Sequence, residues 1–95
     1  MKAVVVITDS AALPVFEKGF LTAEGRGFTL IPELLGRGLT GVKAGNRVHP
    51  GSSSLLLTVV EDADLDSTLT FVRRLRDEAG MAEATKIYVM PAEEG

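Results

Sequence analysis

The stretch GRGLTGVKAGNRVHPGSSS, residues 36–54, concentrates the residue types that could contact an anion. It holds five of the ten glycines of the chain and its only histidine, His49. No Asp or Glu occurs between Leu34 and Val60, and three basic residues supply positive charge there. Because the whole chain has a net charge of −3, this segment would attract an anionic ligand or partner. The glycines would equally suit a long hairpin that only turns, and no Gly-Lys-Ser/Thr ending predicts a P-loop.

The sequence contains few residues that could catalyse a reaction or bind a metal ion. The chain has no cysteine, and His49 has neither a second histidine nor a carboxylate near it in the sequence. No Ser/His/Asp set, Cys/His set or thiolate metal site is therefore predicted. Asp62, Asp64 and Asp66 are spaced like the start of a calcium loop, but the glycine and glutamate that complete such a loop are missing. We expect helix capping there, no metal site, and no enzyme activity.

Length and composition predict one folded domain over residues 1–95. With 45% hydrophobic and 24% charged residues, the chain has the balance of an ordinary globular domain. Its acidic net charge argues against nucleic-acid binding, which needs a basic face. The apolar run after Lys2 is too short for a signal peptide or for a bilayer span. We expect a cytoplasmic protein that does not insert into a membrane.

Hydrophobic patterns predict four strands and two helices. The strands are expected at residues 3–8, 28–35, 54–62 and 85–90, and Pro32 indicates an edge position, a bulge or a bend in the second. The first helix should begin near residue 12 or 13, after the capping residues Asp9 and Ser10, and end by Gly25. The second should begin after Asp64 or Asp66, bury apolar residues spaced three or four apart, and end at Gly80.

The element order β-α-β-β-α-β is that of the ferredoxin-like fold, an α+β sandwich. In this arrangement a four-stranded antiparallel sheet carries both helices on one face, and here a long loop would join the second and third strands. The strand sequences offer apolar side chains to both faces of the sheet. The face without helices should therefore pack against another copy of the chain.

Four short motifs, in this order, resemble those of the PII-like signalling proteins. They are GFT at 27–29, GRG at 36–38, TVVED at 58–62 and KIYVMPAEE at 86–94. The resemblance extends almost from end to end. The chain is similar to a divergent branch of the family with a shortened T-loop, the long loop of nitrogen regulatory PII proteins. It implies a homotrimer that binds a small anionic ligand in clefts between subunits.

The resemblance also implies ligand-binding positions. They are Thr29, Gly36, Gly38, Val59 and Lys86, of which Thr29 would contact an adenine edge, the glycines would admit phosphate to backbone N–H groups, and Lys86 would supply charge. The chain departs from the family pattern at residues 80–85, where GMAEAT replaces a glycine-rich run and introduces Glu83. An adenine nucleotide (ADP, AMP or ATP) and bicarbonate are therefore both candidate ligands.

The implied function is signal transduction. The ligand would order or release the T-loop, whose residues Lys43, Asn46, Arg47 and His49 would face a membrane transporter or an enzyme. An alternative is a metal-binding trimer similar to the CutA metal-tolerance proteins, for which His49 is the one ligand that the sequence offers.

Overall fold

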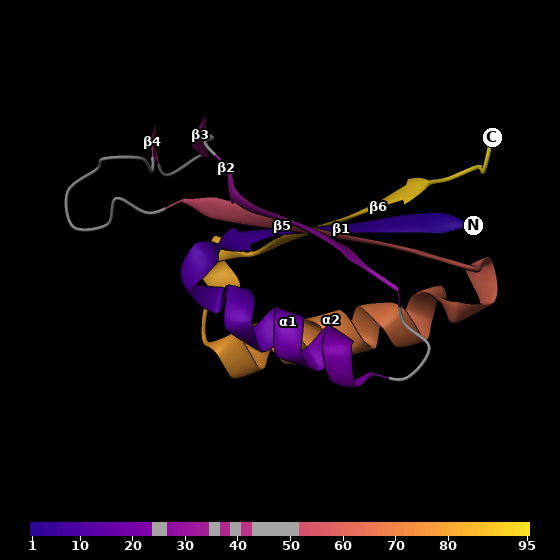
Figure 1. Ribbon diagram of the computed structural model, residues 1–95, viewed down its shortest axis with the longest axis horizontal. Helices are drawn as coiled ribbons and strands as arrows, with labels where there is room; N and C mark the ends of the chain where they lie inside the picture. Colours follow the sequence, from indigo (N-terminus) through magenta and orange to yellow (C-terminus); the bar gives the residue numbers. More distant parts are fainter. Residues whose placement is uncertain (24–26, 35–36, 39–40, 43–51) are drawn as a thin grey trace.

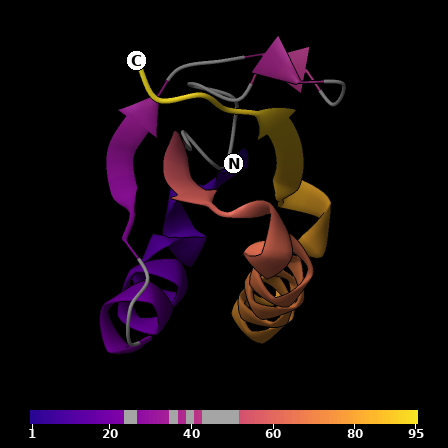
Figure 2. The ribbon, with the colours of Figure 1, turned by 90° about the vertical axis from the view of Figure 1, so that its right-hand side faces the viewer.

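The computed structural model describes residues 1–23, 27–34, 37–38, 41–42 and 52–95. Its main sheet is antiparallel, in the order β2-β5-β1-β6, and both helices cover one face of it (Figures 1 and 2). The strands of this sheet are β1 (Lys2–Asp9), β2 (Thr29–Leu34), β5 (Ser53–Val60) and β6 (Lys86–Pro91), and the helices are α1 (Leu13–Thr22) and α2 (Leu65–Ala79). The predicted ferredoxin-like α+β fold is confirmed.

Five shorter elements connect these. Short 3₁₀ turns precede each helix at Ser10–Ala12 (η1) and Asp62–Asp64 (η2), and a third, η3 (Ala82–Ala84), precedes β6. The strands β3 (Arg37–Gly38) and β4 (Gly41–Val42) pair with each other, within the segment that was expected as a long loop. In Figure 1 they lie beyond one end of the main sheet, on the side away from the helices, whereas both chain termini lie at the other end.

The central strand β1 has apolar side chains on both faces. Val4 and Val6 are fully buried and form the core with Leu56 of β5 and with α1 and α2. Because side chains alternate along a strand, Ala3 and Val5 point to the opposite face. The run AVVVI therefore contributes apolar side chains to both faces of the sheet, which explains why its sequence is continuously apolar.

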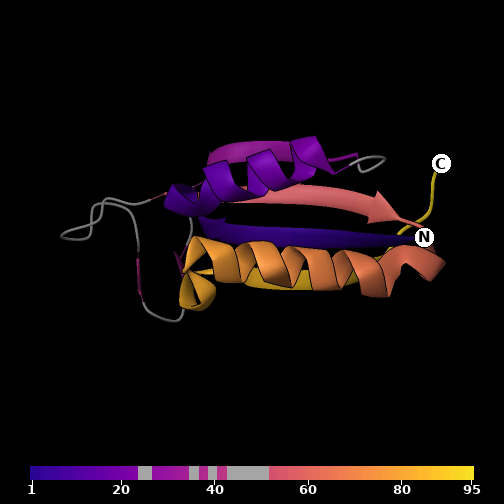
Figure 3. The same ribbon diagram turned by 90° about the horizontal axis from the view of Figure 1, so that it is seen from below.

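The two helices lie side by side along the strands (Figure 3). Phe16 and Phe20 of α1 are buried, and Phe20 packs against Phe28 and Phe71 with ring centroids 5.4 and 5.1 Å apart. Gly19 lies where α1 meets Leu75 of α2, since a Cβ added at Gly19 would be 2.6 Å from a Leu75 methyl carbon. The glycine thus permits the close approach of the helices.

The helix ends follow the sequence signals with one exception. Gly80 ends α2 in the left-handed conformation, with φ of 70°, which glycine adopts without strain. Asp9 caps η1 by accepting a hydrogen bond from the N–H of Ala11 at 2.9 Å. Asp64 occupies the N-cap position of α2, but its side chain makes no capping hydrogen bond, so its predicted capping role is wrong in that detail. The missing capping hydrogen bond costs the helix little stability because Asp66 still places negative charge in the first helical turn.

Strand β2 is an edge strand with an irregular register. Its pairing with β5 shifts between Ile31 and Leu34, around the proline that lacks a backbone donor. Strand β2 therefore has the edge position that Pro32 indicated, together with an irregular register. In the described part of the chain, no helix is long and apolar enough to span a membrane.

We expect Gly19→Ala to lower the free energy of unfolding by about 1 kcal/mol. Overpacking a core contact costs roughly 1–3 kcal/mol, which exceeds the gain in helix propensity of about 1 kcal/mol. Urea denaturation measures the change. In a Leu75→Ala background the clash is absent, so there the same substitution should stabilise the protein. A stabilising effect of Gly19→Ala in the otherwise unchanged chain would contradict the packing argument.

Candidate functional site

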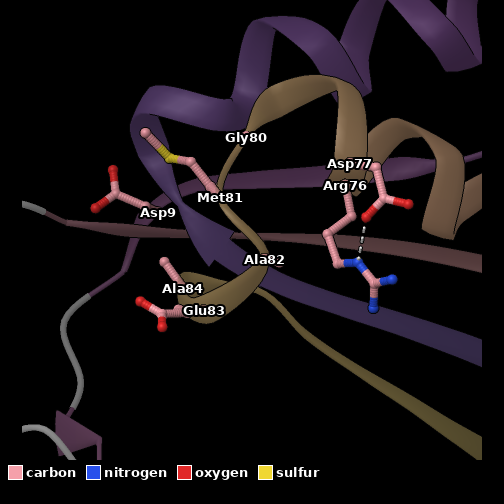
Figure 4. A pocket seen from close by; sticks show the side chains of 8 residues that line it. All are labelled: Asp9, Arg76, Asp77, Gly80, Met81, Ala82, Glu83 and Ala84. Atoms are coloured by element: carbon pink, nitrogen blue, oxygen red, sulfur yellow. Dashed lines mark hydrogen bonds and ion pairs between the residues drawn. The ribbon is translucent and has the colours of Figure 1, made fainter.

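The candidate site lies at the end of the sheet where β1 ends and β6 begins. A hollow of about 530 Å³ opens there beside the connection between α2 and β6 (Figure 4). Its lining comprises Asp9, Arg76, Asp77, Gly80, Met81, Ala82, Glu83 and Ala84. The volume falls in the range of small-molecule sites, and the lining is rich in charge.

Hydroxyl groups support this end of the sheet from the helix side. We call Thr8, Ser10, Ser52, Ser54 and Thr85 the hydroxyl seam. Ser10 Oγ shares hydrogen bonds with Ser52 Oγ at 2.9 Å and with Ser54 Oγ at 2.8 Å, and Ser10 also donates its N–H to the Ser52 carbonyl at 2.9 Å. These bonds fix the point where the chain returns from residues 43–51 into β5.

The second half of the hydroxyl seam reaches the hollow. Thr85 Oγ1 donates to the Met81 carbonyl at 2.7 Å and shares a 2.7 Å hydrogen bond with Thr8 Oγ1. A hydroxyl has one proton to donate, so Thr8 must be the donor to Thr85. Thr8 and Thr85 are both buried, and Thr8 lies directly opposite Ser54 in the β1–β5 ladder. The seam therefore joins the lining of the hollow to the start of β5.

The hollow contains more acidic than basic side chains. Asp9, Asp77 and Glu83 contribute carboxylates, against the single guanidinium of Arg76. Arg76 Nε lies 3.3 Å from Asp77 Oδ1, and Figure 4 shows this pair to one side of the connection, with Asp9 and Glu83 drawn to the other. Of the three carboxylates, Glu83 forms no ion pair with any residue that the structure describes.

Three of the predicted ligand-binding positions lie on the open face of the sheet. Thr29 lies opposite Leu57, and Leu57 lies opposite Val5, which places Thr29 on the face away from the core. The same period of two assigns Val59 and Lys86 to this face. Thr29 is on the edge strand β2, however, and Lys86 is on the other edge strand, β6. The two strands are three spacings apart, about 14 Å, so one subunit does not bring these residues together.

The remaining predicted positions belong to the long connection between β2 and β5. Gly38 is in β3, and Gly36, together with the partner-facing residues Lys43, Asn46, Arg47 and His49, lies outside the described residues. Among the residues that the structure describes, no group of three or more His, Cys, Asp or Glu side chains could hold a metal ion.

A second hollow of about 590 Å³ follows the outer groove between α1 and α2. Its lining includes Lys18, Thr22, Phe71 and Arg74. Arg74 lies over the Phe71 ring, 5.2 Å from its centroid, and pairs with Glu78 at 3.6 Å. None of the predicted site residues lines this groove.

Reasoning from the sequence missed the hydroxyl seam and the part of Arg76 in the hollow. Ser10 was expected only as a capping residue. The partners in the seam are 42 to 77 residues apart, so they are defined by strand register rather than by local pattern. The run of serines at residues 52–54 beside a strand start was the one signal in the sequence.

Comparisons with known proteins agree with the fold. The profile of the family described as "Nitrogen regulatory protein P-II" matches residues 1–94. Among solved structures, the chain is similar to CPII, a nitrogen regulatory PII-like protein from Thiomonas intermedia K12 bound to ADP, AMP and bicarbonate, with a TM-score of 0.58 and 14% identity. That alignment covers 94% of this chain and 82% of CPII. No curated protein matches the sequence.

We expect Thr85→Val to destabilise the protein by about 1–2 kcal/mol, because it leaves the buried Thr8 hydroxyl without this partner and removes one of the two hydrogen bonds that the Met81 carbonyl accepts. Thr22→Val is the matched control, since the Thr22 hydroxyl is exposed on α1 and its loss should change stability by less than about 0.5 kcal/mol. Chemical denaturation of both variants measures the difference. Equal effects of the two substitutions would show that the seam does not support this end of the sheet.

Proposed function

Because the chain belongs to the nitrogen regulatory protein P-II family, we propose that it is a trimeric signal-transduction protein of the cytoplasm. In this proposal a small anionic ligand, either an adenine nucleotide or bicarbonate, binds in clefts between subunits. The bound ligand changes the connection between β2 and β5, which acts as a T-loop and regulates a transporter or an enzyme. The protein itself catalyses no reaction.

The open face of the sheet is the observation that carries this proposal. Four large apolar side chains there are about half exposed: Ile31 at 45%, Val59 at 49%, Tyr88 at 52% and Met90 at 47%. They come from three of the four strands, and they surround the smaller apolar side chains of β1. A contiguous apolar surface of this kind is typical of an interface, and identical chains associate by burying the same surface.

Association through this face would also complete the ligand site. Thr29 and Lys86 lie on opposite edges of one sheet, too far apart for a single phosphate group or adenine ring to contact both. A neighbouring subunit that packs on the open face places its own sheet edge next to one of them. The positions inferred from the family, Thr29, Gly36, Gly38, Val59 and Lys86, would then converge between subunits rather than within one.

The ligand class is proposed from the family and from chemistry. CPII, which has the same fold, binds ADP, AMP and bicarbonate, and these three ligands are all anions. Lys86 is exposed at the first position of β6, beside the hollow, and its ammonium group is a suitable charge for a phosphate or carbonate oxygen. Thr29 is exposed as well, so its hydroxyl is accessible to a ligand.

The partner would contact the connection between β2 and β5. Lys43, Asn46, Arg47 and His49 make this segment basic and polar, which suits an acidic surface on the regulated protein. The hydroxyl seam holds the return of the connection at Ser52, beside the proposed ligand site. A ligand at that site would therefore bind next to the anchored end of the segment.

We expect light scattering to give a mass three times that of the 10.1 kDa chain. Tyr88→Glu should reduce this mass to that of the monomer, because it places a charge within the apolar surface of the proposed interface. Leu21→Glu is the matched control, since Leu21 is 68% exposed on α1, and this variant should remain a trimer. A monomeric wild-type protein would refute the proposed assembly.

We expect ADP, AMP or bicarbonate to raise the midpoint of thermal unfolding by several degrees at saturating concentration. Lys86→Gln should at least halve the shift, whereas Lys18→Gln, a change of equal charge on α1, should preserve it. Screening Cu²⁺ and Zn²⁺ in the same assay tests the metal-binding alternative. Stabilisation by a metal that disappears in His49→Ala, together with no effect of any nucleotide or bicarbonate, would overturn the proposed function.

A further inference from the structure

The connection between α2 and β6 offers few groups that could bind a chain of phosphates. Three of its N–H groups are already used within the chain: Gly80 donates to Asp77 at 3.1 Å, Ala84 to Met81 at 3.1 Å and Thr85 to Ala82 at 3.3 Å. The turn η3 thus consumes donors that an open glycine-rich loop would present to an anion. Three of the six N–H groups of residues 80–85 are therefore unavailable to a phosphate.

The side chains of the connection oppose negative charge directly. Glu83 is exposed on η3, and it forms no ion pair with any residue that the structure describes. The guanidinium of Arg76 is committed to Asp77, and the Asp9 carboxylate, on a residue only 5% exposed, completes the lining. A second phosphate placed here would meet the Glu83 carboxylate, whereas the one cation of the lining is already paired with Asp77.

We infer that Glu83 is a specificity-determining residue that makes the site select nucleoside monophosphates against triphosphates. The inference rests on the proposed function, because it assumes that an adenine nucleotide binds beside this connection. Like charge across a site discriminates between ligands by repelling one of them. Each phosphate beyond the first adds negative charge near Glu83, so the penalty increases from AMP to ATP.

The repulsion acts through partly exposed groups and is therefore moderate. At separations of several ångströms near a protein surface, one unit charge changes an affinity by roughly three- to tenfold. The effect is also screened by salt, because Glu83 lies at the surface. The moderate size of the repulsion and its dependence on salt concentration would distinguish it from a steric effect.

The test compares the dissociation constants of AMP and of ATP, measured by titration calorimetry without divalent cations. The proteins are the wild type, Glu83→Gln and the control Glu61→Gln. Both substitutions remove one negative charge from an exposed glutamate, but Glu61 follows β5 at the other end of the sheet. We expect Glu83→Gln to improve the binding of ATP relative to AMP by about three- to tenfold, with a smaller gain at high salt. We expect Glu61→Gln to leave the ratio unchanged within about twofold.

Several outcomes would overturn the inference, and they can be distinguished from a failure of the proposed function. If all three proteins bind nucleotides with the same AMP-to-ATP ratio, or if Glu61→Gln changes the ratio as much as Glu83→Gln, Glu83 does not set selectivity, although the proposed function stands. If none of the proteins binds either nucleotide, nucleotide sensing itself is refuted, and the inference falls with it. A ratio that changes equally at low and high salt would also contradict an electrostatic cause.

Discussion

Burial of one face of β1 beneath the two helices is the constraint on which the other features depend. Val4 and Val6 are fully buried against α1 and α2, and this fixes which way every neighbouring side chain points. The strand register then determines which face of the sheet each side chain of β5, β2 and β6 occupies. The packing of β1 against the helices thus separates a helix-covered core from an apolar open face. It also determines which side chains lie at the polar end of the sheet, where β1 stops.

Much of the fold could be predicted from the sequence because its signals are local. The spacing of apolar residues marked α2, Gly80 marked its end, and Pro32 marked an irregular edge strand. The apolar character of both sheet faces was also visible, since a run such as AVVVI cannot place all of its side chains beneath helices. The capping of α2 was less predictable, because Asp64 and Asp66 are both acceptable capping residues, and the final geometry depends on how η2 enters the helix.

The candidate site was only partly predictable. Thr29, Val59 and Lys86 came from a resemblance to a family, and the sheet register shows that they share a face. Their separation across the sheet depends on strand order, which short motifs do not specify. Likewise, the hydroxyl seam joins residues that are distant in sequence, and Arg76 was indistinguishable from its neighbours until Asp77 and the hollow were placed beside it.

The anchoring of Ser52 and Ser54 to Ser10 has a consequence for how such a chain can change over evolution. A single residue inserted within β5 would exchange its two faces, placing hydroxyls outside and leucines against the seam. An insertion or deletion before Ser52 has no such effect, because the anchor resets the register before the strand begins. Loop length is thereby free to vary between relatives while the sheet stays constant, so new partners can be acquired without rebuilding the fold.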